Sequence, residues 1–114
     1  RARGSNSLSV RQVRRLGPVV TAAQIPAGEP LYITIDIDAF CPSIAPGTGT
    51  PVWGGLTSAQ AAIMLRDLAG INIIGGDVVE VSPPFDTTGA TASAGAHVAT
   101  ELLSLIGWKL KGGA

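Results

Sequence analysis

Charge and cysteine are scarce in this sequence. Of the 114 residues, 46 % are apolar and only 14 % carry a charge, and the eight Lys and Arg balance the eight Asp and Glu. A net charge of zero argues against a nucleic-acid-binding protein. The single cysteine, Cys41, excludes an internal disulfide and fits a reducing compartment. We therefore expect a cytoplasmic location, with mitochondria as the alternative.

Long apolar runs are also missing. No run approaches the ~20 residues that span a membrane. The Arg-rich start is not followed by the apolar segment of a signal peptide, so no membrane association is expected. The chain is nevertheless too apolar for a disordered tail. So little charge on so small a chain suggests that neighbouring protein covers one or more of its faces.

Predicted strands and helices alternate along the chain. The pattern predicts a helix after Ser9, strands at 19–25, 31–40 and 71–81, and helices at 57–69 and 91–106. Residues 41–55, rich in Gly and Pro, form a long ordered loop, and residues 82–89 form a second loop. This order predicts a parallel sheet with helices packed on it. The apolar faces of 31–37 and 72–80 predict buried central strands.

Asp36 and Asp38 are placed at the end of an apolar strand. Side chains two residues apart on a strand point the same way, and two buried carboxylates repel each other unless something pairs with them. A metal ion resolves that repulsion, and sites in open α/β sheets form beyond the C-terminal strand ends. The structural alternative is that one Asp caps the loop while the other lies in solvent.

Other polar side chains have weaker signals. Glu80 ends the second apolar strand, where it could bind a cationic substrate group or make an edge salt bridge. Asp77 is expected to make a structural hydrogen bond in or beside the strand. His97 is interpreted as a packed or surface histidine, and Cys41 as a small buried loop residue.

Two segments carry a family resemblance. DIDAFCPSIAPGTGTPVWGGLT (36–57) and GGDVVEVSPPFDTTGATA (75–92) resemble the agmatinase/arginase family of ureohydrolases. The resemblance implies an α/β fold with three αβα layers and a mostly parallel sheet, as in arginases and deacetylases. Residues 1–114 would form the C-terminal portion of a single catalytic domain of that kind.

The resemblance also implies a site. Asp36 is similar to the aspartate that bridges two manganese ions, Asp38 to one that chelates a single ion, and Glu80 to the glutamate that orients the guanidinium group of the substrate. Two Mn²⁺ ions per complete site activate a water that attacks the guanidinium carbon, releasing urea and an amine.

Some family features are absent. Cys41 stands where the family usually has a third Asp, and Val52 where many agmatinases have Glu. The ligand motifs Gly-Gly-Asp-His and Asp-Ala-His-x-Asp do not occur in this sequence. Both belong to the N-terminal half of the family's domain, so we interpret the chain as a fragment with an incomplete site.

The functional expectation concerns a full-length parent. It is a manganese-dependent hydrolase of a linear guanidine, agmatine or a guanidino acid, and a homo-oligomer, trimer or hexamer, while the isolated chain is inactive. The alternatives are an arginase and a non-catalytic, truncated or degenerate family member with an assembly or binding role. A phosphotransferase of the haloacid dehalogenase type is disfavoured, because Ala39-Phe40 follows the D-x-D where Gly or Thr is usual.

Overall fold

The chain forms helices and two strands in alternation after a helical N-terminal region. The structure, a computed structural model, describes residues 7–26 and 28–112. The elements in chain order are α1 (Val10–Leu16), α2 (Pro18–Ala22), β1 (Leu31–Asp36), the 3-10 turn η1 (Ile37–Ala39), α3 (Ser58–Arg66), β2 (Ile73–Val79), the 3-10 turn η2 (Pro83–Phe85) and α4 (Ala90–Leu110). Among the described residues, no helix is long and apolar enough to cross a membrane.

The two strands pair in parallel, as the sequence predicts. Ile33 of β1 lies opposite Gly76 of β2, and Asp36 lies opposite Val79. The connection between them contains α3, the βαβ arrangement that parallel neighbours require. The C-terminal ends of both strands therefore lie side by side at one edge of the sheet.

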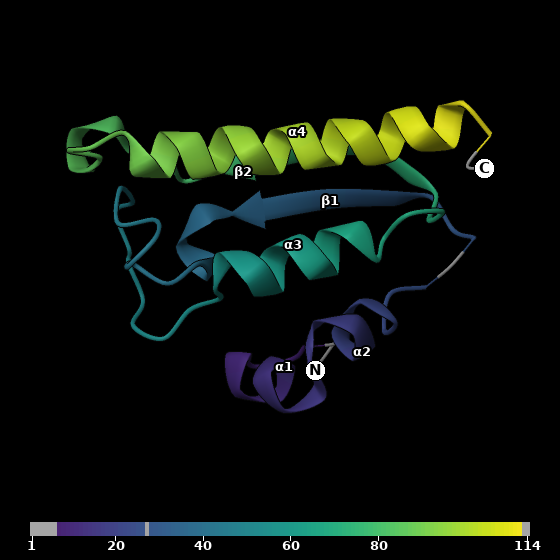
Figure 1. The fold of residues 1–114 in the computed structure, drawn as a ribbon, viewed down its shortest axis with the longest axis horizontal. Coiled ribbons are helices and arrows are strands. Elements are labelled where there is room, and N and C mark those ends of the chain that lie inside the picture. The colour runs from purple at the N-terminus through teal and green to yellow at the C-terminus, as the bar shows by residue number, and fades with distance from the viewer. Residues whose placement is uncertain (1–6, 27, 113–114) are drawn as a thin grey trace.

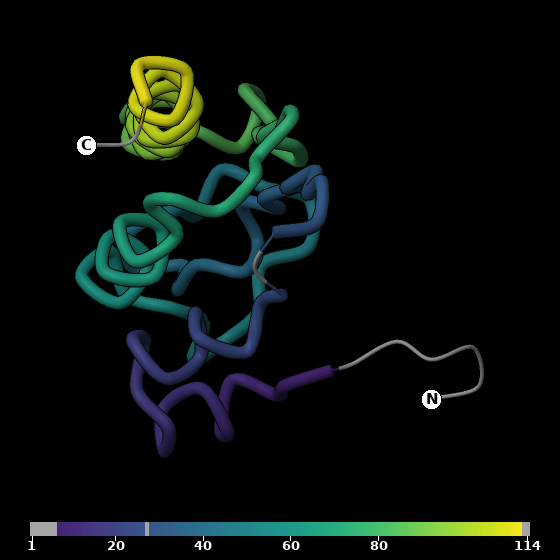
Figure 2. The backbone as a smooth tube through the Cα atoms, turned by 90° about the vertical axis from the view of Figure 1, so that its right-hand side faces the viewer, coloured from purple at the N-terminus to yellow at the C-terminus, as the bar shows by residue number. Residues whose placement is uncertain are grey.

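Helices α3 and α4 cover one face of the strands (Figures 1 and 2). A Cβ built on Gly76 would lie 2.8 Å from the Ile33 carbonyl oxygen of the neighbouring strand and 3.2 Å from Leu102 of α4. The first distance is too short for a real side chain, so glycine is needed at position 76. A Cβ built on Gly95 of α4 would lie 3.2 Å from Val81 and 3.8 Å from Val78, which shows how closely α4 packs on the sheet. The core lies between the layers and includes Ile73, Leu65, Val98, Leu102 and Leu105.

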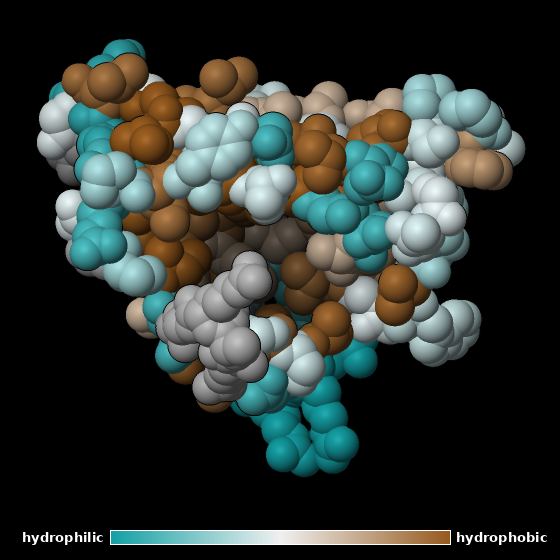
Figure 3. Space-filling model, turned by 180° about the vertical axis from the view of Figure 1, so that it is seen from behind, coloured by the Kyte–Doolittle hydropathy of each residue, from teal (hydrophilic) through white to brown (hydrophobic). Residues whose placement is uncertain are grey.

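The other face of the strands is open in the described residues, contrary to the expectation of strands buried on both faces. Tyr32 is 58 % exposed on this side. The hydroxyls of Tyr32 and Thr34 donate to Asp77, at 3.0 and 2.5 Å, which confirms the structural hydrogen bond expected of Asp77. The hydrogen bond from Tyr32 to Asp77 is the main cause of the raised pKa of Tyr32. From behind, the molecule is hollowed and apolar residues line the hollow (Figure 3).

The strand prediction for residues 19–25 is wrong, because helix α2 occupies 18–22. Gly17 turns the chain with a φ of 83°, and Pro18 occupies the first helical position, where its fixed φ and missing N–H suit a helix. The Thr21 hydroxyl donates to the Gly17 carbonyl at 2.8 Å. These local contacts and packing against α3 override the strand preference of Val19 and Val20.

The other helices begin where the sequence predicts. Ser9 and Thr57 are N-caps, and each forms a capping box, with Gln12 and Gln60 respectively. Helix α3 ends at Arg66, a few residues early, while α4 continues to Leu110, beyond the predicted end at Ile106.

Candidate metal and substrate site

Asp36 is the last residue of β1 and also caps the turn that follows. Its Oδ1 accepts a hydrogen bond from the Asp38 N–H at 3.0 Å, so it is the N-cap of η1. Ile37, fully buried, anchors this turn in the core. Oδ2 of Asp36 accepts no hydrogen bond from the part of the chain that the structure describes. Asp36 is thus a capping residue, as the structural alternative from the sequence has it, but only through Oδ1. Its Oδ2 is left available to bind a metal ion.

Asp38 lies in η1 and not on the strand, so the strand alternation used to pair it with Asp36 does not apply. Its orientation is fixed instead by the loop 41–55: the Thr50 hydroxyl donates to Asp38 Oδ2 at 2.6 Å. The base of this loop is closed by Leu56, whose N–H donates to the Ala39 carbonyl and whose carbonyl accepts from the Cys41 N–H, both at 2.8 Å. Thr50 was not predicted, because only the folded loop reveals that it contacts Asp38.

Glu80 follows the last residue of β2 directly and has a φ of 72°. This left-handed conformation is uncommon for a residue other than glycine and costs ~1–2 kcal/mol. The Glu80 carboxylate forms no hydrogen bond or ion pair with the described residues. A strained backbone that presents an unpaired carboxylate at a strand end is typical of a binding residue.

The sheet register brings Asp36 and Glu80 to one edge, and Asp38 follows Asp36 by two residues in η1. Asp36 lies opposite Val79, so Glu80 follows the partner of Asp36 by one residue. Asp36 borders an apolar cavity, and Asp38 borders a separate hollow with Trp53 and Gly54. A single cleft shared by Asp36, Asp38 and Glu80 stays a prediction.

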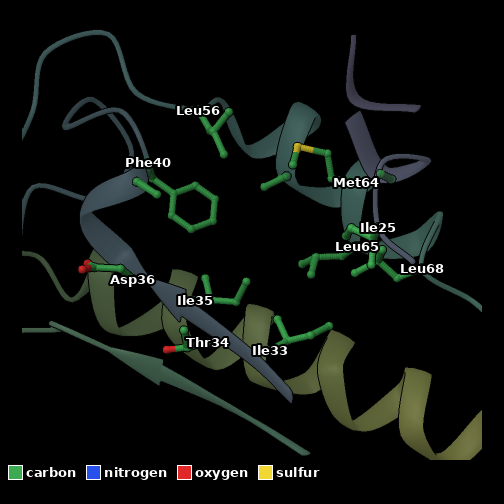
Figure 4. Close-up of a pocket in the computed structure, with 13 residues that line it drawn as sticks. Ile25, Ile33, Thr34, Ile35, Asp36, Phe40, Leu56, Met64, Leu65 and Leu68 are labelled. Carbon is green, nitrogen blue, oxygen red and sulfur yellow. The ribbon is translucent and has the colours of Figure 1, made fainter. Parts of the chain in front are cut away.

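The apolar cavity lies between β1, α2 and α3 and measures about 220 Å³. Figure 4 shows Asp36 and Thr34 pointing away from it, while the side chains that surround it are Ile25, Ile33, Ile35, Phe40, Leu56, Met64, Leu65 and Leu68. Because its lining is apolar, this cavity is a packing space behind the carboxylates and not a site for a cation.

Two further polar residues hold the site loops in place. Arg14 of α1 donates from Nη2 to the Gly54 carbonyl at 2.5 Å, which ties α1 to the end of the loop 41–55. Asp86 accepts from the N–H groups of Ala92 and Thr91, at 2.9 and 3.1 Å, and so caps the start of α4. These hydrogen bonds, that from Ala92 first, hold the pKa of Asp86 below its ordinary value.

Cys41 and His97 lie outside the site. Cys41 is half-buried and not buried as expected, because its thiol accepts a hydrogen bond from the Ser43 hydroxyl at 3.1 Å in an accessible turn. That bond is the main cause of the lowered pKa of the Cys41 thiol. His97 is a surface residue of α4, one of the two expected places, with Nε2 3.6 Å from Glu101 Oε1.

The residues present fit part of a manganese site. Carboxylate oxygen suits Mn²⁺, and Asp36 and Asp38 each keep one oxygen outside the hydrogen bonds that orient them. Among the described residues, no three or more His, Cys, Asp and Glu side chains lie where they could hold a metal ion together. Further ligands would have to come from outside those residues.

Comparison with known proteins identifies the family to which the chain belongs. The arginase family model matches residues 1–104. The chain is 48 % identical to an agmatinase of Chromobacterium violaceum and 44 % identical to a guanidinopropionase of Pseudomonas aeruginosa, in each case over 90 % of this chain and 33 % of the relative.

A solved structure agrees on the fold. The crystal structure of a hypothetical agmatinase from Burkholderia thailandensis superposes with a TM-score of 0.92 at 47 % identity, over 98 % of this chain and 36 % of that one. The chain thus spans about a third of the length of its relatives and includes the paired strand ends with their carboxylates. It belongs to the arginase family.

Proposed function

We propose that the chain is the C-terminal segment of a manganese-dependent hydrolase that converts a linear guanidine, agmatine or a guanidino acid, into urea and an amine. The names of the relatives support this substrate class, since they include agmatinases, a guanidinopropionase and a guanidinobutyrase. The parent is proposed to be a homo-oligomer, a trimer or hexamer, on the basis of the family resemblance.

The observation that carries the proposal is the pairing of β1 with β2. Asp36 ends one strand and Glu80 follows the end of the next, with Asp36 opposite Val79. This supports the proposal that Asp36, with Asp38 two residues later, serves the metal and Glu80 a guanidinium cation at one sheet edge, where α/β proteins form their sites. Hydrolysis of a linear guanidine needs both a metal site and a guanidinium site, because the reacting carbon must be held while the nucleophile is generated beside it.

Each carboxylate has a separate task. Asp36 and Asp38 would hold manganese, which supplies a nucleophile from water at neutral pH. Thr50 holds one oxygen of Asp38, which fixes the direction of the other. Glu80 would accept hydrogen bonds from the guanidinium group, a charge-assisted contact that fixes orientation.

A non-catalytic role is the second candidate. It rests on the donor set of the described residues, in which Asp36 and Asp38 have no third Asp, Glu, His or Cys beside them to hold a metal ion. In that role the chain would keep the fold for assembly or binding.

The first experiment compares the purified 114-residue chain with the full-length parent. Each is incubated with Mn²⁺ and with agmatine, 4-guanidinobutyrate, 3-guanidinopropionate or arginine, and urea release is measured. The parent is expected to act on one of the first three, and the isolated chain on none. Urea release by the isolated chain would contradict the fragment interpretation, and preferential use of arginine would favour an arginase.

A chimaera tests whether this segment can supply its share of a working active site. The matching third of the Chromobacterium violaceum agmatinase is replaced by this chain, so that the relative supplies the remaining residues. The proposal predicts urea release from agmatine. A folded chimaera that binds manganese but releases no urea, while the unmodified agmatinase is active, would favour the non-catalytic role.

A further inference from the structure

Gly47 lies where two loops of the candidate site meet. Its N–H donates to Thr91 Oγ1 at 2.7 Å, and its carbonyl accepts from the Ser82 N–H at 2.8 Å. Thr91 stands at the start of α4 and has no exposed surface. A residue of the loop 41–55 is thus bonded on both sides to the segment that follows β2. We call Gly47, Ser82 and Thr91 the loop clasp.

The clasp has no space for a side chain at its centre. A Cβ on Gly47 would lie 2.6 Å from the Asp86 Cβ, 2.9 Å from the Asp86 Cα and 2.8 Å from Thr91 Oγ1. Asp86 cannot easily move away, because its carboxylate holds the Thr91 and Ala92 N–H groups. Glycine is therefore needed here for close approach of the two loops.

Each of the two loops that the clasp joins carries a residue of the candidate site, or one that orients it. Thr50, which orients Asp38, follows Gly47 by three residues, and Glu80 precedes Ser82 by two. Within the described residues, the clasp links the loop that orients Asp38 to the loop that carries Glu80 through hydrogen bonds. The sheet register sets the separation between Asp36 and Glu80, whereas a shift at Gly47 would change the separation between Asp38, the second metal carboxylate, and Glu80.

We propose that Thr91 and Gly47 are positioning residues, which set that separation and thereby the placement of the guanidinium carbon. The inference rests on the proposed function, because it assigns the two ends of the site to metal and substrate. A misplacement of ~1 Å in a reacting pair costs up to ~100-fold in rate, so a clasp remote from the reacting atoms affects turnover.

The test uses the full-length parent and compares Thr91→Val with Thr91→Ser. Valine keeps the shape but removes the acceptor of the Gly47 N–H, while serine keeps the hydroxyl. Thr91→Val is expected to lower kcat/KM by about tenfold or more at full manganese content, and Thr91→Ser by about threefold or less. Thr100→Val is the matched control, because the Thr100 hydroxyl only bonds Ala96 within the same helix.

A second measurement is independent of turnover. Hydrogen exchange followed by mass spectrometry is expected to show faster exchange in both 45–51 and 80–88 in Thr91→Val, and unchanged exchange there in Thr100→Val. Gly47→Ala should give the same paired change. If Thr91→Val does not fold, Thr91→Cys, with a weak acceptor of similar size, takes its place and an intermediate loss of kcat/KM is expected.

The two readouts separate the inference from the proposed function. Faster exchange in only one of the two loops, or a normal kcat/KM in Thr91→Val with both loops loosened, would overturn the clasp as a positioning device. An equal loss of kcat/KM in Thr91→Val and Thr91→Ser would do the same. A parent that hydrolyses no guanidine would overturn the proposed function, and the exchange result would then decide whether the clasp couples the two loops.

Discussion

At the scale of single residues, Glu80 is the one non-glycine with a positive φ in the described part of the chain, 72°. We predict that Glu80→Gly and Glu80→Ala in the parent lose guanidine hydrolysis equally, by about 30-fold or more, because both lack the carboxylate. The glycine variant should be more stable than the alanine variant by ~1 kcal/mol, since only glycine adopts this conformation freely. Thermal unfolding beside urea release checks both. Equal stability would mean that residue 80 is not held left-handed, and retained activity in either variant would remove Glu80 from the site.

Thr48 provides a second residue-scale prediction. Its hydroxyl is buried, the residue being 3 % exposed, and Oγ1 has no hydrogen-bond partner among the described residues. Replacing an unpaired buried hydroxyl by a methyl group removes a cost of ~1 kcal/mol or more. Thr48→Val is therefore expected to raise the free energy of unfolding of the parent, measured by denaturant titration. The same change at Thr91 is expected to lower it, because it removes the acceptor of the Gly47 N–H. A destabilised Thr48→Val would mean that residues outside this chain bond the hydroxyl.

At residue scale, the sequence reveals the charged residues better than their partners. Asp36 and Glu80 are conspicuous because each ends an apolar strand, where a buried carboxylate is costly unless something pairs with it. Thr50 and Thr91 are not, since threonine is common in loops and caps, and their contacts join residues 12 and 44 positions apart. Asp38 was found for a reason that the structure corrects: a capped 3-10 turn places it, not strand alternation.

At the scale of elements, the start of α4 depends on Asp86, three residues before the N-cap Gly89. Because hydrogen bonds lower the pKa of Asp86 in the folded state, its ionised form stabilises the fold above the ordinary Asp pKa, and this stabilisation is lost as pH falls through the lowered folded value. We predict that Asp86→Asn destabilises the parent at neutral pH and that the difference from the unmodified protein shrinks in acid. Thermal unfolding across pH measures it, and a constant difference down to strongly acidic pH would contradict the assignment.

The elements themselves were predicted where local signals agree. Thr57 with Gln60 and Ser9 with Gln12 fix helix starts through contacts three residues apart, so sequence spacing is sufficient. The failure at 19–25 has the opposite cause. Valine at 19 and 20 favours a strand, but the turn at Gly17 and packing on α3 make the segment helical.

At the scale of the whole molecule, the described residues form one helical layer on a two-stranded sheet, with Tyr32 and Ile74 58 % and 64 % exposed. The low charge of the sequence indicated covered faces, and the relatives, about three times as long, have the residues to cover them.

We propose above that Asp36 holds metal while Glu80 holds substrate. The most direct measurement is the manganese content of the purified parent, by elemental analysis, beside urea release, for Asp36→Asn and Glu80→Gln. Asparagine keeps the cap of η1 through its amide oxygen but loses the charge, and glutamine keeps the size of Glu80. We predict that Asp36→Asn loses manganese and activity together, whereas Glu80→Gln keeps manganese and loses activity. Full manganese and normal turnover in Asp36→Asn, or turnover at the parent rate in Glu80→Gln, would contradict it.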